Sequence, residues 1–346
     1  MVFMNDGEML DKLTMIPAKT ILIVTSLGLW GGILSPAISA DLNSFVLYSE
    51  AEKQSYIIAK NLLESKNEIT YNQAEIAQSL PILTPTTPVA LEKVNRGLAL
   101  VEQENIEGAI ASFREAIQLD SKLVAAHYNL GLALRQQGQL QAAATSFHRA
   151  TELQPNFALA FANVGAALLE GNNLAQAQNY LQRAIQLDAN LGVAHYNLGL
   201  VLKEQGNLES AIASFRRASE LSPNAPEPHY YIGSIYLEQG QNSAAKNAFE
   251  AATKISPRYP EAQYNLGRIL LEQGNLPSAL NTFRKATQAN PNYANGYYGA
   301  GLVFMKQNRY GEARRVLEYA HDLYRSQGNS EWSAHTEQIL TEIKSL

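Results

Sequence analysis

Apolar residues recur at helical spacing through most of the chain. In the stretch HYNLGLVLKEQGNLESAIASFRRASELSP, residues 195–223, they fall three or four positions apart up to a break at QGN, and again up to Pro223. This spacing predicts two helices joined by a tight turn. Gly206 in the break suits a left-handed turn, and Pro223 disfavours helix in the residue before it.

The pattern returns at a constant interval, without insertion or deletion. Glycine marks one position of each unit: Gly97, Gly131, Gly165, Gly199, Gly233, Gly267 and Gly301. Alanine marks two later positions of each unit, the first at Ala109, Ala143, Ala177, Ala211, Ala245, Ala279 and Ala313, and the second at Ala116, Ala150, Ala184, Ala218, Ala252, Ala286 and Ala320. Small residues at fixed positions leave room where two helices cross closely, so we expect these three ladders to mark helix–helix contacts.

The spacing, the Leu-Gly pair of the first helix, the Ala and Phe of the second helix and the terminal proline resemble the tetratricopeptide repeat. The departures from that pattern are local: Ser121 and Ala189 for the proline, Leu181 and Leu317 for the phenylalanine, and Asn172 and Asn308 for the hinge glycine. The resemblance implies an all-α fold, a right-handed superhelical solenoid of helix-turn-helix units with a concave groove lined by the first helices. Seven units are predicted within residues 90–324: 90–123, 124–157, 158–191, 192–225, 226–259, 260–293 and 294–324.

Both ends of the repeat array have their own predictions. Terminal repeats need a polar-faced lid, and residues 325–346 are expected to supply it as a capping helix, with Trp332, Ile339, Ile343 and Leu346 on its apolar face. Residues 41–89 are expected to form a helical segment followed by the proline-rich linker PILTPTTP.

Residues 1–40 have the layout of a secretory signal. Lys12 and Lys19 precede an apolar run over residues 21–34, and small residues follow up to Ala40. Two interpretations stay open: a signal peptide cleaved after Ala40, or a membrane anchor through residues 21–40. With lysines on the N-terminal side, either one predicts an exported protein, periplasmic, lumenal or secreted, or one held at the membrane by its N-terminus.

Composition and motifs narrow the function. The net charge of −5 and the lack of a Lys/Arg-rich run beyond Lys19 argue against nucleic acid as a partner. Without cysteine there is no disulfide, thiolate metal site or thiol nucleophile, and no motif of a metalloprotease, a phosphate-binding loop or a serine nucleophile is present. We therefore predict no catalytic residue, no cofactor and no metal site. His127, His195 and His229 share one repeat position with Phe161 and Tyr297, which indicates packing.

Asparagine occupies the position two residues before the ladder glycine in five of the seven units: Asn95, Asn129, Asn163, Asn197 and Asn265. Asparagine is a mediocre helix former, so something outside the helix is expected to select it. A carboxamide both donates and accepts hydrogen bonds, which matches an extended peptide backbone. These residues resemble the asparagine ladder that holds substrate peptide in the tetratricopeptide domain of O-linked N-acetylglucosamine transferase.

Tyrosine stands one residue before this position in five units: Tyr128, Tyr196, Tyr230, Tyr264 and Tyr298. Tyrosine supplies broad contact area and a hydroxyl, as binding surfaces often do. The alternative is that both rows stabilise neighbouring repeats, or were copied by duplication. The lysines and arginines of a carboxylate clamp are missing: those positions hold Tyr128, Leu132, Val193 and Asn197, with only Arg268 at a comparable site.

The sequence thus predicts a non-catalytic scaffold for protein–protein interaction, which binds extended peptide segments in the concave groove. The alternative prediction is an accessory subunit of an enzyme or of a membrane-complex assembly system, such as a glycosyltransferase partner or a photosystem-type assembly factor.

Overall fold

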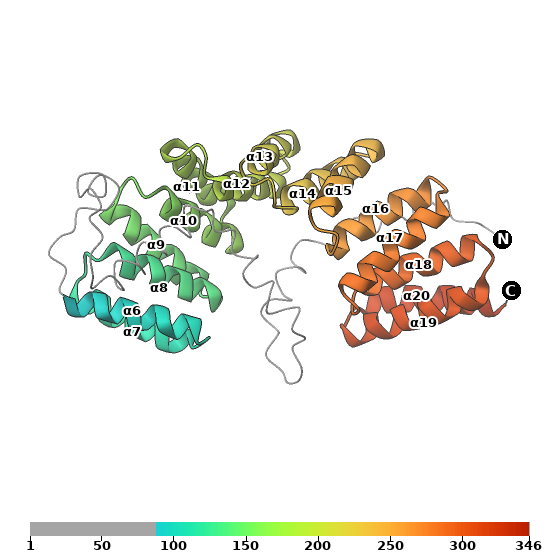
Figure 1. Ribbon diagram of the computed structural model, residues 1–346, viewed down its shortest axis with the longest axis horizontal. Coiled ribbons are helices and arrows are strands. Elements are labelled where there is room, and N and C mark those ends of the chain that lie inside the picture. Colours follow the sequence, from blue (N-terminus) through green and yellow to red (C-terminus); the bar gives the residue numbers. More distant parts are fainter. Residues whose placement is uncertain (1–87, 346) are drawn as a thin grey trace, which may run out of the picture. The chain divides into compact units, whose positions relative to one another are not determined.

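The computed structural model describes residues 88–345, which form fifteen helices, α6–α20, and no strand (Figure 1). The predicted signal or anchor over residues 1–40, nearly all of the segment 41–89, and Leu346 lie outside the described residues. Within residues 88–345, no helix combines the length and the apolarity needed to span a membrane.

The helices follow the predicted pairs and end in one further helix. The seven pairs are α6 Pro88–Glu102 and α7 Ile106–Leu119, α8 Val124–Gln136 and α9 Leu140–Leu153, α10 Ala158–Glu170 and α11 Leu174–Leu187, α12 Gly192–Glu204 and α13 Leu208–Leu221, α14 Glu227–Glu238 and α15 Asn242–Ile255, α16 Pro260–Glu272 and α17 Leu276–Ala289, and α18 Ala294–Lys306 and α19 Tyr310–Ser326. The last helix is α20, Ser330–Lys344. The prediction of an all-α fold of helix pairs is confirmed.

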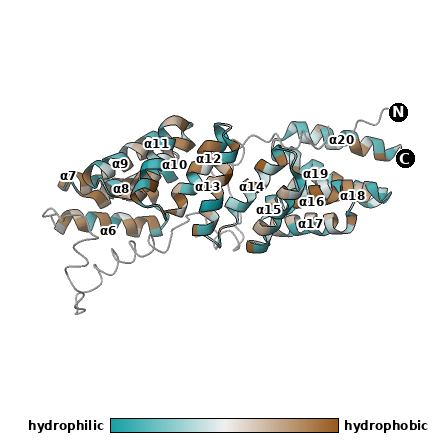
Figure 2. Cartoon of the chain, turned by 90° about the horizontal axis from the view of Figure 1, so that it is seen from above, coloured by the Kyte–Doolittle hydropathy of each residue, from teal (hydrophilic) through white to brown (hydrophobic). Residues whose placement is uncertain are grey.

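The chain divides into two compact units, which we call unit 1, Met1–Asn207, and unit 2, Leu208–Leu346. Helices α6–α12 belong to unit 1 and helices α13–α20 to unit 2. The division falls inside the fourth predicted repeat, at its hinge. The helices of both units carry hydrophobic and hydrophilic positions along their length (Figure 2).

Within a pair, a side chain of the second helix rests on the ladder glycine of the first. A Cβ atom added to Gly131 would lie 2.7 Å from the Phe147 ring, and one added to Gly267 would lie 2.7 Å from the Phe283 ring. Real Cβ atoms do not approach so closely, so only glycine fits. The residues that occupy these seats are fully buried: Phe113, Phe147, Leu181, Phe249, Phe283 and Leu317. The prediction that the glycines leave room for a close crossing is confirmed.

The hinges between paired helices adopt the left-handed conformation. Four hold glycine at positive φ: Gly138 at 74°, Gly206 at 79°, Gly240 at 70° and Gly274 at 74°. The remaining three hold Glu104, Asn172 and Asn308, at φ of 60°, 60° and 57°. Asparagine tolerates this conformation, whereas a glutamate there costs about 1–2 kcal/mol. The two asparagine departures from the repeat pattern therefore keep the hinge geometry.

Six of the seven second helices end at the same repeat position whether or not proline follows, and only α19 among them runs further, to Ser326. Helices α9, α13, α15 and α17 stop two residues before Pro155, Pro223, Pro257 and Pro291. Helices α7 and α11 lack that proline, and there an aspartate makes the turn. Asp120 Oδ1 accepts from the N–H of Lys122, and Asp188 Oδ1 accepts from the N–H of Asn190, both at 2.9 Å. Asn290 makes the same turn beside Pro291, by accepting from the N–H of Asn292 at 2.9 Å, so the Asx turn forms with or without the proline.

Helix α20 covers the end of unit 2, as predicted for a capping helix. Asn329 caps its N-terminus by accepting from the N–H of Trp332 at 3.2 Å. Ile339 and Ile343 are buried, and the half-buried Trp332 contacts the Tyr298 ring with centroids 5.4 Å apart. The last pair thus buries its exposed side against α20.

Gly267→Ala is expected to destabilise the protein by about 1–3 kcal/mol, because the new methyl group would overlap the Phe283 ring. Gly311→Ala is the matched control in the same unit. Gly311 is exposed on α19, and an added Cβ would have no neighbour within 4 Å, so this change is neutral or stabilises by up to about 1 kcal/mol. Urea denaturation followed by circular dichroism measures the stability of both variants. Equal unfolding midpoints for the two variants would contradict the close contact between Gly267 and the Phe283 ring.

Candidate functional site

The five predicted asparagines lie on first helices. Unit 1 holds four of them, Asn95 on α6, Asn129 on α8, Asn163 on α10 and Asn197 on α12, and unit 2 holds Asn265 on α16. We call these five residues the asparagine row. Each member lies at the same point of its helix, two residues before the ladder glycine that the second helix contacts.

Members of the asparagine row differ in their hydrogen bonds. The Asn163 amide donates to the Tyr128 hydroxyl at 3.0 Å and to the Leu159 carbonyl at 3.1 Å. The first of these bonds joins two neighbouring repeats directly. Tyr230 and Asn265 occupy the same two positions, and an interaction with the Asn265 side chain partly offsets the effect of burial on the pKa of Tyr230. In both cases the tyrosine stands one residue before the corresponding asparagine position of the preceding repeat, so these two amides already stabilise the stack.

Asn129 and Asn197 have no tyrosine at the corresponding place, where Val94 and Ala162 stand instead. The Asn129 amide donates to the Ala125 carbonyl of its own helix at 2.8 Å, and its Oδ1 accepts nothing from the described chain. Asn197 makes no side-chain hydrogen bond to any described residue, although only 9% of it is exposed. Its polar atoms are nevertheless not sealed from solvent. Asn95, which is half-buried, is likewise without a hydrogen bond to residues 88–345.

Three of the predicted tyrosines pack on the second helix of their own repeat and on the turn that leads into the next repeat. The Tyr128 ring lies 5.6 Å from that of Phe147 in its own repeat and 5.0 Å from that of Phe157, which directly precedes the next repeat. Tyr230 and Tyr264 pack in the same way, on Phe249 with Tyr259 and on Phe283 with Tyr293. This arrangement favours the alternative that the tyrosines hold neighbouring repeats together.

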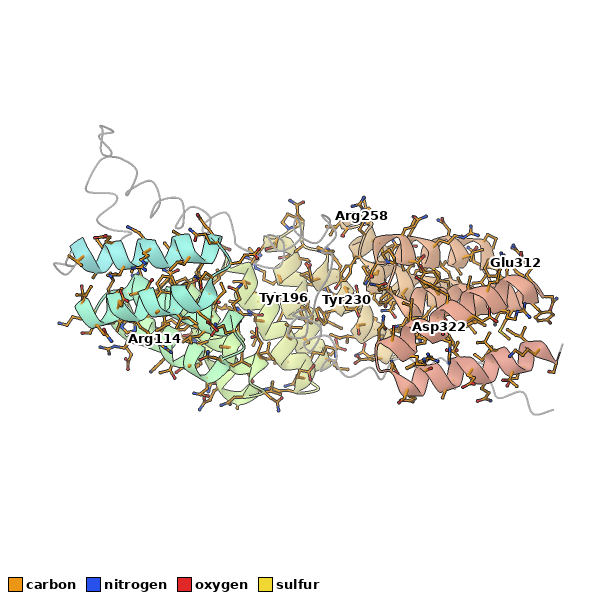
Figure 3. The ribbon with its side chains drawn as sticks, turned by 90° about the horizontal axis from the view of Figure 1, so that it is seen from below. Arg114, Tyr196, Tyr230, Arg258, Glu312 and Asp322 are labelled. Atoms are coloured by element: carbon orange, nitrogen blue, oxygen red, sulfur yellow. The ribbon has the colours of Figure 1, made fainter. Side chains whose placement is uncertain are left out.

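The exposure of the tyrosines decides which could meet a ligand. Tyr264 and Tyr298 are 5% and 1% exposed, so their rings offer almost no surface in this structure. Tyr128, Tyr196 and Tyr230 are half-buried; Figure 3 labels Tyr196 on α12 and Tyr230 on α14. Burial raises the pKa of Tyr264 to about 12 and raises the pKa of Tyr230 and Tyr298 as well. Their hydroxyls stay protonated at neutral pH.

Two of the histidines connect a first helix to the turn before it. His127 Nε2 and His195 Nε2 donate to the carbonyls of Ser121 and Ala189, both at 3.0 Å. Gln263 Nε2 makes the same bond to the Pro257 carbonyl at 3.1 Å. Burial lowers the pKa of His127, which favours the neutral ring. The packing role predicted for this position is confirmed for His127, which is buried, and the hydrogen bond is a feature that the sequence pattern had not indicated.

No group of three or more His, Cys, Asp or Glu residues that could hold a metal occurs in the described part of the chain. Arg268, the residue comparable to a clamp position, is 4% exposed and donates to Asn265 Oδ1 at 3.4 Å. Two hollows open on the described surface, each of about 520–530 Å³. One lies in unit 1 beside the hinges at Gly138 and Asn173, and the other lies in unit 2 among α17, α18 and α19. Neither is lined by the predicted asparagines or tyrosines.

Paired helices that stack through seated rings and inter-repeat hydrogen bonds define a helical-repeat protein. Models of the tetratricopeptide repeat match residues 97–138 and 199–240, residues 124–157, and residues 230–294 and 270–330, together more than half of the chain. The chain belongs to the tetratricopeptide repeat family. A comparison with curated protein sequences gave no match.

Solved structures show the same fold. A tetratricopeptide repeat protein from Parabacteroides merdae is 18% identical, with 72% of this chain and 99% of that one covered and a TM-score of 0.55. PilF of Pseudomonas aeruginosa is 17% identical, with 62% and 97% covered and a TM-score of 0.54. YrrB, a tetratricopeptide repeat protein with an unusual peptide-binding site, is 24% identical, with 56% and 99% covered and a TM-score of 0.46. The likenesses to the Parabacteroides merdae protein and to PilF concern the fold alone.

The Tyr128–Asn163 hydrogen bond is expected to contribute about 0.5–1.5 kcal/mol of coupling between two repeats. A double-mutant cycle of Tyr128→Phe and Asn163→Ala, read as the free energy of unfolding in urea, measures it. Tyr128→Phe combined with Asn179→Ala is the control, because Asn179 is exposed on α11 and its side chain has no hydrogen bond to described residues. Additivity in both cycles would show that the bond does not form in solution.

Proposed function

We propose that this protein is a non-catalytic scaffold that binds extended segments of partner proteins along the first helices of unit 1. The observation that carries the proposal is Asn197, a residue only 9% exposed whose carboxamide lacks a hydrogen bond to the described chain and is not sealed from solvent. A polar group in such a position gains by meeting a donor and an acceptor from elsewhere. An extended peptide backbone supplies both.

The same reasoning extends along unit 1. Asn95 and the Oδ1 atom of Asn129 are also open to a ligand, while the Asn163 amide between them is used by Tyr128. The binding role therefore falls on Asn95, Asn129 and Asn197, and the role of Asn163 is mainly to stabilise the stack. At about 1 kcal/mol net per hydrogen bond, less the cost of ordering the peptide, three such residues support weak and sequence-tolerant binding.

A protein partner fits the charge of the chain better than a nucleic acid does. The net charge is −5, and phosphate binding requires clustered lysine and arginine. Backbone recognition through carboxamides needs no particular charge, and the concave faces of helical-repeat proteins commonly serve as binding surfaces. These arguments favour a peptide or an extended protein segment as the ligand of the asparagine row.

Asn197→Ala is expected to weaken peptide binding about fivefold while leaving the unfolding midpoint nearly unchanged, because it removes a side chain that bonds only to the ligand. The measurement is fluorescence anisotropy with a panel of short extended peptides of varied sequence, and Asn179→Ala is the surface control. The same peptides N-methylated at alternate backbone amides should bind weakly to the wild type. If N-methylation and Asn197→Ala both leave binding intact, the asparagine row does not read a peptide backbone.

We further propose that the protein acts outside the cytoplasm, on the order of cationic, apolar and small residues over residues 1–40. Mass spectrometry of the native protein is expected to show an N-terminus at Asp41 after cleavage, or an N-terminal part that retains residues 21–40 in a membrane-bound protein. Fractionation should then place the repeats outside the cytoplasm, in a periplasmic, lumenal or secreted fraction or on the non-cytoplasmic face of a membrane. An uncleaved protein in the soluble cytoplasmic fraction would contradict the proposal.

A further inference from the structure

A hollow of about 520 Å³ in unit 2 lies among α17, α18 and α19, apart from the asparagine row. Its apolar lining includes Leu280, Phe304 and Val316, and its charged lining includes Arg284 and Arg315. Glu312 lines the same hollow from the first turn of α19, where Figure 3 labels it. An apolar surface of this size with a few polar groups at its edge is typical of a site for a side chain of a ligand.

Tyr319 gives this hollow an exposed aromatic wall. It is 46% exposed, one of three large hydrophobic residues exposed among the described residues. Its ring meets that of Tyr297 edge to face, with centroids 4.6 Å apart. Tyrosine and arginine are the residue types that most often dominate binding energy in protein interfaces. The hollow brings both types together around an apolar floor.

The repeat fold does not require these residues. The position of Tyr319 holds Glu115, Arg149, Arg183, Arg217, Ala251 and Lys285 in the other repeats. The position of Arg315 holds Ala111, Thr145, Asn179, Ala213, Asn247 and Asn281. The six other pairs form with polar or small residues at both places, so neither stacking nor copying of the repeat accounts for a tyrosine and an arginine in the last pair.

The charge at the edge of the hollow is positive. Arg284 and Arg315 are exposed, and neither forms an ion pair within residues 88–345. Glu312 is already paired with Arg309 at 2.6 Å, and this pairing lowers the pKa of its carboxyl. Arg315 also lowers the pKa of the Glu312 carboxyl through its charge, but it forms no ion pair with it, so the guanidinium groups of Arg284 and Arg315 keep their hydrogen-bond donors for a ligand. A guanidinium pairs best with a carboxylate in a two-pronged hydrogen bond.

We propose that this hollow docks a short acidic segment of a partner protein, with one large apolar side chain inserted next to Tyr319 and flanking carboxylates bound by Arg284 and Arg315. The anchor buries apolar surface against Phe304 and Val316, and the carboxylates set the direction of the segment. This site is independent of the peptide binding proposed for the asparagine row, since it lies in unit 2 and reads side chains instead of backbone.

The probes are two pools of short fluorescent peptides, each with Leu, Phe or Trp at the centre, flanked by glutamates in one pool and by lysines in the other. We expect the full chain to bind the glutamate pool about tenfold more tightly in low salt, and we expect rising salt to reduce that binding. Tyr319→Ala and Arg315→Asn install the residues that α15 holds at the same positions, Ala251 and Asn247, so they preserve the fold, and they should abolish the preference because they remove the aromatic wall and one of the two cations.

One further variant makes the result specific. Arg258→Ala, which replaces an exposed arginine of unit 2 outside the hollow, should leave binding of the glutamate pool unchanged. Equal affinity for the two pools, or full binding by the Tyr319→Ala, Arg315→Asn double variant with a wild-type circular dichroism spectrum, would overturn the proposal. Loss of binding in the Arg258→Ala variant would also overturn it, since the attraction would then come from general surface charge.

Discussion

The stack depends on one contact, the seating of a ring or a leucine of the second helix on a glycine of the first. At Gly97, Gly165 and Gly301 a Cβ atom would come within 2.4–2.5 Å of Phe113, Leu181 or Leu317, which is closer than atoms pack. Either phenylalanine or leucine can occupy this position without changing how the paired helices cross, because both side chains fill the space over the glycine, which has no side chain of its own. The glycine therefore determines how closely the paired helices approach. The alanines of the second helix are small enough to avoid a clash at this distance.

This constraint leaves the other positions of the first helix open to different uses. His127 and Gln263 secure the helix to the preceding turn through a side-chain hydrogen bond to a carbonyl. Tyr128 fills the space between its own second helix and the next repeat, and its hydroxyl binds Asn163. Where the preceding repeat has no tyrosine, as at Ala162, the amide of the next asparagine, Asn197, is not used by the stack. At one repeat position, therefore, Asn163 contributes to the stability of the stack and Asn197 is left for binding.

Much of the fold follows from the sequence, because its determinants are local or strictly periodic. The ladder of glycines, the hinge residues and the second-helix ends can each be read from spacing, and even the departures at Asn172 and Asn308 keep the left-handed hinge. Tyrosine burial could have been anticipated from a further signal. Where a repeat has Tyr128, Tyr230 or Tyr264, an aromatic residue stands at one fixed position near its end, at Phe157, Tyr259 and Tyr293, and contacts the tyrosine ring.

The finer features of the site could not be predicted in this way. Whether an asparagine is used by the stack depends on a residue of the preceding repeat, so a single repeated position carries two roles. The hollow at Tyr319 joins three helices from two repeats, and no motif within one repeat marks it. The division of the chain at Asn207 likewise has no counterpart in the uninterrupted repeat register.

The central claim is that Asn197 is held ready for a ligand while Asn163 is already engaged by the protein. Side-chain amide NMR of these two residues, with and without an extended peptide, tests it directly. In the free protein the Asn197 NH2 protons should exchange with water faster than those of Asn163, and peptide should shift and protect the Asn197 signals while leaving those of Asn163 in place. A bound peptide that leaves Asn197 unshifted, or that perturbs both residues equally, would contradict the account.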